Sequence, residues 1–138
     1  MQNRIAAAGG AALAVACLAA CSSPPMPSPP AAGVTINGGN VLQTQAVGCS
    51  QLQWMWTIDI GNAASGARVT VDTSGPTPAA TTVHINSLGG FTGTYSQGNG
   101  TADTKVSGKT FTVAGTANGF DTTSNLPASA QYRIVARC

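Results

Sequence analysis

Apolar and polar side chains alternate with a period of two through most of the chain from Val34 to Cys138. In "QWMWTIDI" one face carries Trp54, Trp56, Ile58 and Ile60. Successive side chains of a β-strand point to opposite faces, so this alternation is typical of half-buried strands. About eight such segments occur, at residues 34–37, 41–47, 53–60, 67–72, 81–86, 89–96, 109–115 and 130–138.

Residues that favour turns separate these segments. They stand at Asn37-Gly38-Gly39, Gly61-Asn62, Ser74-Gly75-Pro76, Gly89-Gly90, Gly98-Asn99-Gly100, Ser107-Gly108 and Asn118-Gly119. No stretch has the pattern of a long amphipathic helix. Residues 34–138 are therefore predicted to form an all-β domain, either an antiparallel β-sandwich or a partly open barrel.

Few residues carry charge. Charged residues make up 7% of the chain and Glu is absent, against roughly 25% charged residues in an average soluble domain. Without the amino-terminal Arg4, five Lys and Arg face four Asp, which gives a net charge of +1. Nucleic-acid binding needs a clustered basic face. The sequence offers no such cluster, so nucleic acid is not expected as a partner.

The first twenty residues have the features of an export signal. A short positive start, "MQNR", precedes an apolar run of 16 residues from Ile5 to Ala20. A membrane-spanning helix needs about 20 residues, whereas a shorter run that ends in small residues is typical of a signal peptide. A buried core helix is the alternative, but the proline-rich chain that follows leaves it no neighbour. Residues 1–20 are therefore predicted to be removed.

Leu18-Ala19-Ala20-Cys21 resembles the lipobox of bacterial lipoproteins, in which an aliphatic and two small residues precede a cysteine. The thiol of that cysteine receives a diacylglycerol group, and the chain is cleaved before it. Cys17 lies inside the apolar run and is expected to leave with the signal peptide. Two or more acyl chains give long-lived attachment. The mature protein is therefore predicted to be anchored through Cys21 at the extracytoplasmic face of the cell membrane, without spanning it.

Residues 21–33 form the predicted tether. Five of the eight prolines lie in this segment, a composition that favours polyproline II and cannot form a packed core. At about 3.1 Å per residue the tether spans on the order of 35 Å. A passive spacer is the simpler interpretation, and a tether that also carries O-linked sugars on Ser22, Ser23 and Ser28 is the alternative.

Cys49 and Cys138 both fall on the apolar parity of their segments, so both can face the core. Disulfides persist outside the membrane, and this one would close a loop of about 90 residues and stabilise by about 4 kcal/mol. A zinc site is the alternative, but one histidine and no further mature thiol make four ligands difficult to assemble. The disulfide is predicted, and no metal or cofactor is expected.

Catalytic groups are scarce in the predicted domain. His84 is the only histidine, and it lies on the polar parity between Val83 and Ile85, which predicts a surface residue. No G-x-S-x-G motif accompanies it, and catalysis needs matched groups held close together. No catalytic residue is therefore expected, and the protein is predicted not to be an enzyme, with a hydrolase as the weakest of the hypotheses.

The parts follow one another in a recognisable order. After "LAACSS" come the Ser/Pro-rich tether, "VTING", Cys49, the stretch "GTYSQGNGTADTKVSGKTFTVAGTANGFD", and a terminal strand that ends on Cys138. This order resembles the mycobacterial lipoprotein antigens of the nineteen-kilodalton type. The resemblance implies a cell-envelope lipoprotein without catalytic residues, lipidated at Cys21, with Cys49 and Cys138 as a pair. It also implies recognition of the lipidated amino terminus by host innate receptors and O-glycosylation of the tether.

Two functional hypotheses remain. In the first, the β-domain is a non-catalytic surface antigen or binding module, with a lipid or glycan as one class of ligand. In the second, the protein carries a lipid or glycolipid in a cavity lined by Trp54, Trp56, Phe91 and Phe111. Ordinary packing of so small a domain leaves no pocket of about 300 Å³ or more. Trp54 and Trp56 are interpreted as core residues, because Ile58 and Ile60 continue their face, and a sugar-stacking platform is the alternative.

Overall fold

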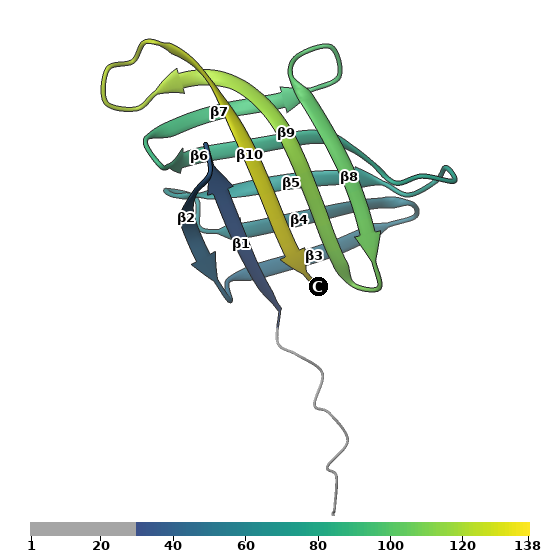
Figure 1. The fold of residues 1–138 in the computed structure, drawn as a ribbon. Coiled ribbons are helices and arrows are strands. Elements are labelled where there is room, and N and C mark those ends of the chain that lie inside the picture. Colours follow the sequence, from purple (N-terminus) through teal and green to yellow (C-terminus); the bar gives the residue numbers. More distant parts are fainter. Residues whose placement is uncertain (1–29) are drawn as a thin grey trace, which may run out of the picture.

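The computed structural model describes residues 30–138, which form ten β-strands joined by short turns (Figure 1). The strands are β1 (Ala31–Ile36), β2 (Gly39–Thr44), β3 (Val47–Leu52), β4 (Met55–Gly61), β5 (Gly66–Asp72), β6 (Ala79–Leu88), β7 (Phe91–Ser96), β8 (Thr101–Ser107), β9 (Thr110–Asp121) and β10 (Pro127–Arg137). No helix occurs among the described residues. The predicted all-β architecture is confirmed, with ten strands in place of about eight.

All strand pairs are antiparallel, and the sheet runs in the order β2-β1-β10-β9-β7-β6-β5-β4-β3. The sheet folds over on itself, so that β1, β2, β8 and β10 lie across β3 to β7 as a second layer (Figure 1). β9 connects the layers, because Thr110–Thr116 pairs with β8 and Asn118–Asp121 pairs with β7. The result is a nearly closed barrel, as one of the two predicted architectures.

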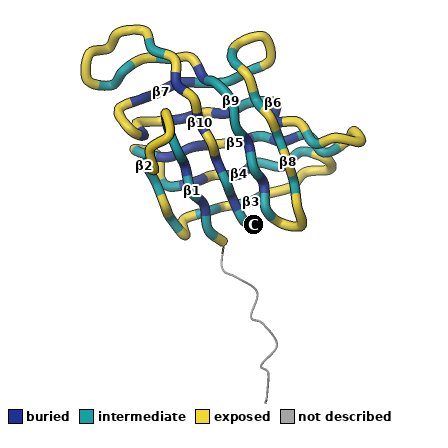
Figure 2. Tube along the Cα trace, viewed as in Figure 1, coloured by how far each residue is buried: buried dark blue, intermediate teal, exposed yellow. Residues whose placement is uncertain are grey.

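The core lies between the two layers and is apolar. Buried positions alternate with more exposed ones along most strands (Figure 2), as in Val69 and Val71 of β5 or Ile134 and Ala136 of β10. The described residues include no buried polar or charged side chain. Tyr132 is the one core residue with a polar end, and its hydroxyl donates a hydrogen bond to the Thr101 carbonyl at 2.8 Å. Burial raises the pKa of Tyr132.

Two glycines let β9 bend from one layer into the other. A Cβ on Gly115 would lie 2.0 Å from the Thr101 carbonyl oxygen, and one on Gly119 would lie 1.9 Å from that of Thr92. Glycine inside a strand often marks such a close approach of two backbones. The predicted turn at Asn118-Gly119 is therefore wrong, since both residues lie within β9. The chain turns later, between Asp121 and Pro127.

Trp54 lies outside the core, and its predicted place there is wrong. The β3–β4 hairpin turns at Gln53 and Trp54, where Leu52 pairs with Met55 and Gln53 has a φ of 55°. Trp54 is 60% exposed and Leu52 is 79% exposed. The alternation of "QWMWTIDI" therefore begins in the turn, and only the part from Met55 belongs to the strand. Trp56 is half-buried and packs against the core, as predicted.

Strand boundaries differ from the sequence pattern in three further places. The predicted segment 41–47 is divided, since β2 ends at Thr44 and β3 begins at Val47. β8 was not expected, because its inward positions are Ala102, Thr104 and Val106, of which one is polar and one is small. β1 begins at Ala31, within the segment 21–33 that the sequence assigns to the tether.

Candidate interaction surfaces

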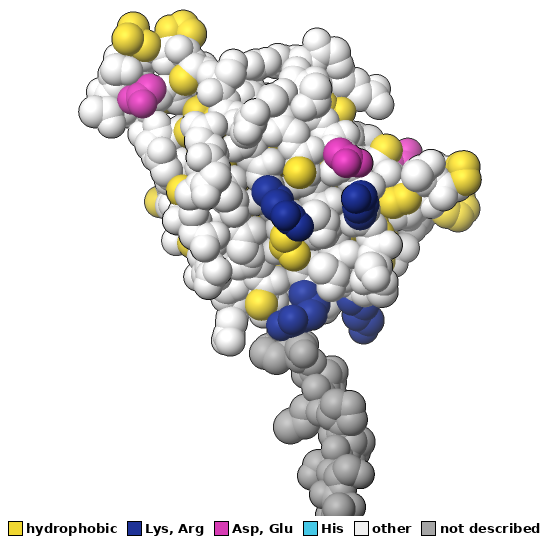
Figure 3. Space-filling model, in the orientation of Figure 1, with side chains coloured by type: hydrophobic (Ala, Val, Ile, Leu, Met, Phe, Trp, Pro, Cys, Tyr) yellow, Lys and Arg dark blue, Asp and Glu magenta, His cyan; other side chains and the backbone are white. Residues whose placement is uncertain are grey.

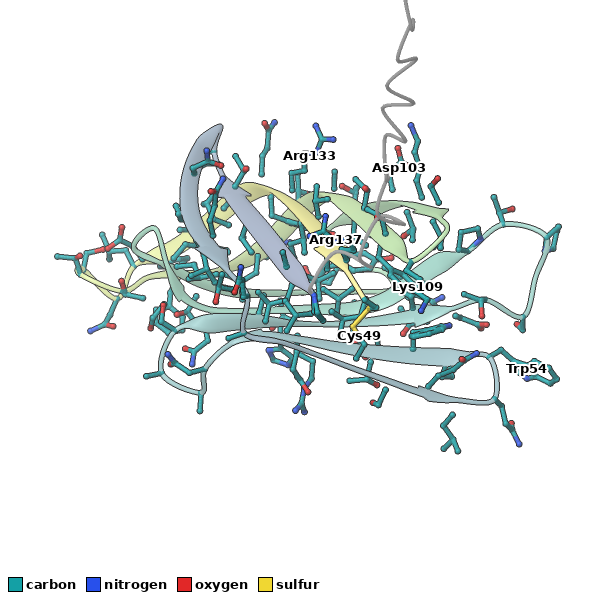
Figure 4. All side chains as sticks on the ribbon, turned by 90° about the horizontal axis from the view of Figure 1, so that it is seen from below. Cys49, Trp54, Asp103, Lys109, Arg133 and Arg137 are labelled. Carbon is teal, nitrogen blue, oxygen red and sulfur yellow. A yellow bond between two sulfur atoms is a disulfide. The ribbon has the colours of Figure 1, made fainter. Side chains whose placement is uncertain are left out.

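A disulfide joins Cys49 of β3 to Cys138, the residue after β10, so the bridge connects the two layers (Figure 4). Their Cα atoms are 6.0 Å apart, and 89 residues separate them in sequence. Both cysteines are half-buried and pack against the core. This is the pairing that strand parity predicts. The proposed lipid site, Cys21, and the serines of the tether lie outside the described residues.

The four aromatic residues proposed to line a cavity are not gathered around one. Phe91 and Phe111 are buried in the core, with 4% and 3% exposed. The rings of Trp56 and Phe111 pack against each other with centroids 5.2 Å apart. Trp54 points away from the domain at the hairpin end (Figure 4), and Leu52, on the other side of Gln53 in the chain, is also exposed. The core packing therefore occupies the space that the carrier hypothesis assigns to a lipid.

A polar row crosses the outer surface of the sheet. It consists of residues paired side by side on six successive strands: Asp59, Arg68, His84, Thr94, Asn118 and Ser129. Arg68 Nε donates to Asp59 Oδ1 at 2.5 Å, and Ser129 Oγ donates to Asn118 Oδ1 at 2.6 Å. The hydrogen bond to Asp59, and then the charge of Asp59, raise the pKa of Arg68. The register of the strands, rather than burial, places these six side chains next to one another.

A surface hollow of about 320 Å³ lies over one end of this row, lined by Asp59, Arg68, His84 and Asn86 together with the β4–β5 turn. His84 is exposed, as its parity predicts, and its Nδ1 lies 3.2 Å from Thr94 Oγ1. Asp59 is held by Arg68, so it does not orient the imidazole as a catalytic carboxylate would. The geometry supplies hydrogen-bonding groups to a ligand and gives no assembled nucleophile, base and orienting group.

Residues 30–138 contain no group of three or more His, Cys, Asp or Glu side chains that could hold a metal ion. Within the same part of the chain, no helix has the length and apolar character needed to cross a membrane.

The other layer carries a basic strip, which we define as Lys105, Lys109, Arg133 and Arg137. These are four of the five Lys and Arg residues of the described chain, and Figure 3 shows cationic side chains gathered over this layer and at its lower end. The sequence pattern predicts no basic cluster, so that expectation is wrong. The signal of this cluster is the polar parity of Lys105, Arg133 and Arg137, but only the antiparallel pairing of β8, β9 and β10 brings the two sequence regions together.

Comparison with known proteins gives a consistent assignment. Residues 26–138 match the family described as Mycobacterium 19 kDa lipoprotein antigen. A putative lipoprotein of Mycobacterium indicus pranii is 45% identical over 141 residues, covering 100% of both chains. A putative lipoprotein of Mycobacterium avium subsp. hominissuis is 37% identical over 142 residues, covering 100% of this chain and 97% of the relative.

Proposed function

Because the chain belongs to the family of Mycobacterium 19 kDa lipoprotein antigens, we propose that it is a lipid-anchored surface antigen whose β-domain is a non-catalytic binding or display module. The family match confirms the resemblance seen in the sequence. The protein is a cell-envelope lipoprotein that is anchored to the membrane, and its family is not a known family of enzymes. The proposal adds the anchoring residue, the exposed face and the role of the domain.

The observation that carries this proposal is the position of Cys21. It ends a Leu-Ala-Ala-Cys pattern after an apolar run, and it lies ten residues before the first strand residue, Ala31. Two relatives named as putative lipoproteins align with the whole chain, the amino-terminal segment included. We propose that Cys21 carries the acyl chains on the extracytoplasmic side and that host innate receptors recognise this lipidated end.

The outer surface of the domain supports a binding or display role. Apart from the Tyr132 hydroxyl, the described side chains that can form hydrogen bonds lie outside the core, as in the polar row and its hollow. Thr, Ser and Asn side chains present donors and acceptors without charge, which suits glycan hydroxyl groups as well as protein surfaces. We propose a glycan as the ligand class of this surface.

The chain provides a matched pair of variants for the anchor. In Cys21→Ala we expect loss of partition into the detergent phase and an unprocessed amino terminus, because the acylated thiol is missing. In Cys17→Ala we expect wild-type partition, because that cysteine leaves with the signal peptide. Detergent phase separation followed by mass spectrometry of the amino-terminal peptide measures both. Equal partition of the two variants would contradict the assignment of Cys21.

The non-catalytic role has its own test at His84, the only imidazole of the chain. We expect His84→Ala to keep the stability of the domain, and we expect the wild type to show no turnover of ester or glycoside probes that the variant could lose. A turnover of ester or glycoside probes that is measurable in the wild type and absent from the variant would overturn the proposal in favour of a hydrolase. Thr94→Val, which removes the hydroxyl group beside Nδ1, tests whether such a turnover uses the pair.

A further inference from the structure

The residues of the basic strip lie in successive rows of paired strand residues on one outer face of the domain. Arg137 pairs with Ala31 and Thr110. Two residues earlier on β10, Val135 pairs with Thr112, which pairs in turn with Lys105. The next row holds Arg133 and Asp103 on either side of Ala114. Rows that face the same way are about 6.7 Å apart. The strip therefore extends about 13 Å along the domain from the end at which β1 begins.

That end is also where the chain arrives from Cys21. Ala31 pairs with Arg137, and the backbone N–H of Cys138 donates to the carbonyl of Lys109 at 2.8 Å. Figure 4 views the domain from this end and shows Lys109 and Arg137 near the disulfide. Ten residues lead from Cys21 to Ala31, and they reach at most about 36 Å. The basic end of the domain cannot move far from a membrane that holds Cys21.

Acidic groups do not cancel this charge. Asp103 is the one acidic side chain in the rows of the strip, and among the described residues Lys105, Lys109 and Arg133 have no carboxylate within ion-pair distance. Asp59 and Asp72 belong to the other layer. Asp121 ends β9, eleven residues beyond Thr110, at the far end of the domain. The charge distribution is therefore positive at the end near the anchor.

The strip also has a place for an anionic group. Lys105, Arg133 and Asp103 line a hollow of about 320 Å³ together with the short side chains of Thr112 and Ala114, so two cationic groups and one carboxylate surround it. A guanidinium group binds phosphate oxygens through two parallel hydrogen bonds, and an ammonium group adds a point charge. Lys105, Lys109 and Arg133 are exposed and Arg137 is half-buried with a contact inside the protein, so the first three are the groups available to phosphates.

We propose that the basic strip docks on anionic phospholipid headgroups of the membrane that holds Cys21, so that the domain stands with its β1 start and β8–β9 turn at the lipid surface. This inference rests on the proposed anchor. The tether keeps the strip at high local concentration near the headgroups, and each Lys or Arg near an anionic surface adds about fivefold to the docked population. The β9–β10 turn then faces away from the surface.

The test uses the full lipidated chain in vesicles of phosphatidylcholine, with and without phosphatidylglycerol, and measures amide hydrogen exchange at Gly108 and Lys109. We expect slower exchange on the anionic vesicles, and loss of that protection in about 1 M salt, where the Debye length is about 3 Å. Lys109→Gln should weaken the protection about fivefold. Arg68→Gln removes the same charge from the other layer and should leave the protection unchanged.

The outcomes separate the two proposals. A chain that does not float with neutral vesicles contradicts the lipid anchor, and with it this inference. A chain that floats with both vesicles but exchanges equally on them overturns the docking alone. Equal loss of protection in Lys109→Gln and Arg68→Gln also overturns the docking, because the protection would then depend on the net charge of the protein and not on the position of the basic strip.

Discussion

Trp54 and Trp56 are two positions apart and differ in what they contribute to the domain. Trp56 packs against Phe111 across the two layers, whereas Trp54 is 60% exposed in a hairpin turn. We expect Trp56→Ala to lower the free energy of unfolding by about 2 kcal/mol, less than the roughly 3–5 kcal/mol of a fully buried tryptophan. Trp54→Ala should change it by less than about 0.5 kcal/mol. Urea unfolding with the disulfide intact measures both, and equal losses would contradict the assignment.

The same pair shows how far single residues can be predicted from sequence. Parity places Trp56, Val69, Val83 and Ile134 correctly, because period-two alternation follows from strand geometry alone. It fails at Trp54 because the turn residues Gln53 and Trp54 include no Gly, Asn, Asp or Pro, so no local signal marks the end of the strand. The positive φ of Gln53 is imposed by closure of the β3–β4 hairpin.

At the scale of elements, the bend in β9 depends on glycines at positions where a side chain would clash with the backbone of a neighbouring strand. A Cβ on Gly119 would lie 1.9 Å from the Thr92 carbonyl oxygen, whereas one on Gly48 would meet nothing within 4 Å. We expect Gly119→Ala to destabilise the domain by about 3 kcal/mol, since β7 and β9 would have to separate. Gly48→Ala is the matched control and should cost less than about 0.5 kcal/mol. Thermal unfolding of both variants tests the difference.

The β9–β10 turn gives an acid dependence of stability. Asp121 Oδ1 accepts hydrogen bonds from the backbone N–H groups of Ser124 and Thr123, at 2.9 and 2.8 Å, and these bonds lower the pKa of Asp121. Because the folded pKa lies below the unfolded value of about 3.9, the contribution is complete above that pH and is lost as the pH falls below it. Asp72 behaves in the same way.

We therefore expect the melting temperature of the wild type to fall between about pH 6 and pH 2 more than that of Asp121→Asn. The amide keeps an acceptor oxygen for the turn but takes up no proton. Since Asp72 titrates in both chains, the difference between their pH profiles isolates Asp121. Parallel pH profiles of the melting temperature for the two chains would show that the charge of Asp121 does not contribute to the stability of the turn.

Elements and surfaces were predictable from sequence to different degrees. The strands with β-branched inward residues, such as β5 and β6, follow directly from the alternation. β8 does not, because Thr104 faces inward and uses its Oγ1 to accept the Ala80 N–H, a bond that only the fold reveals. The basic strip and the polar row depend on which strands are neighbours. Parity assigns each side chain to a face, but the register across six strands is a property of the folded sheet.

At the scale of the whole molecule, the two layers are held together by three devices of different kinds. β9 passes from one layer to the other, the apolar core fills the space between them, and the Cys49–Cys138 bridge joins β3 to the end of β10. The bridge lies at the end where β1 begins and the basic strip starts. A pull transmitted through the anchor would reach the domain at β1, which pairs with the strand that this disulfide secures.

The last prediction concerns that bridge. It closes a loop with a sequence separation of 89 residues, so loss of the bridge should lower the free energy of unfolding by about 4–5 kcal/mol on the chain-entropy model. This is a large share of the roughly 5–15 kcal/mol that stabilises a typical domain. The double variant Cys49→Ala/Cys138→Ala is preferred to a single one, which would leave a thiol free to pair between molecules. Guanidinium unfolding measures the loss.

A reductant supplies the control, since it should shift the wild-type midpoint to that of the double variant and leave the double variant unchanged. A thiol assay on the unfolded chain reports whether the bridge has opened. If the wild type shows two free thiols after reduction and still unfolds at its original midpoint, the core and the β9 crossing are enough to hold the layers together. The bridge would then act on the end of β10 locally, and the stability of the whole molecule would not depend on the 89-residue closure.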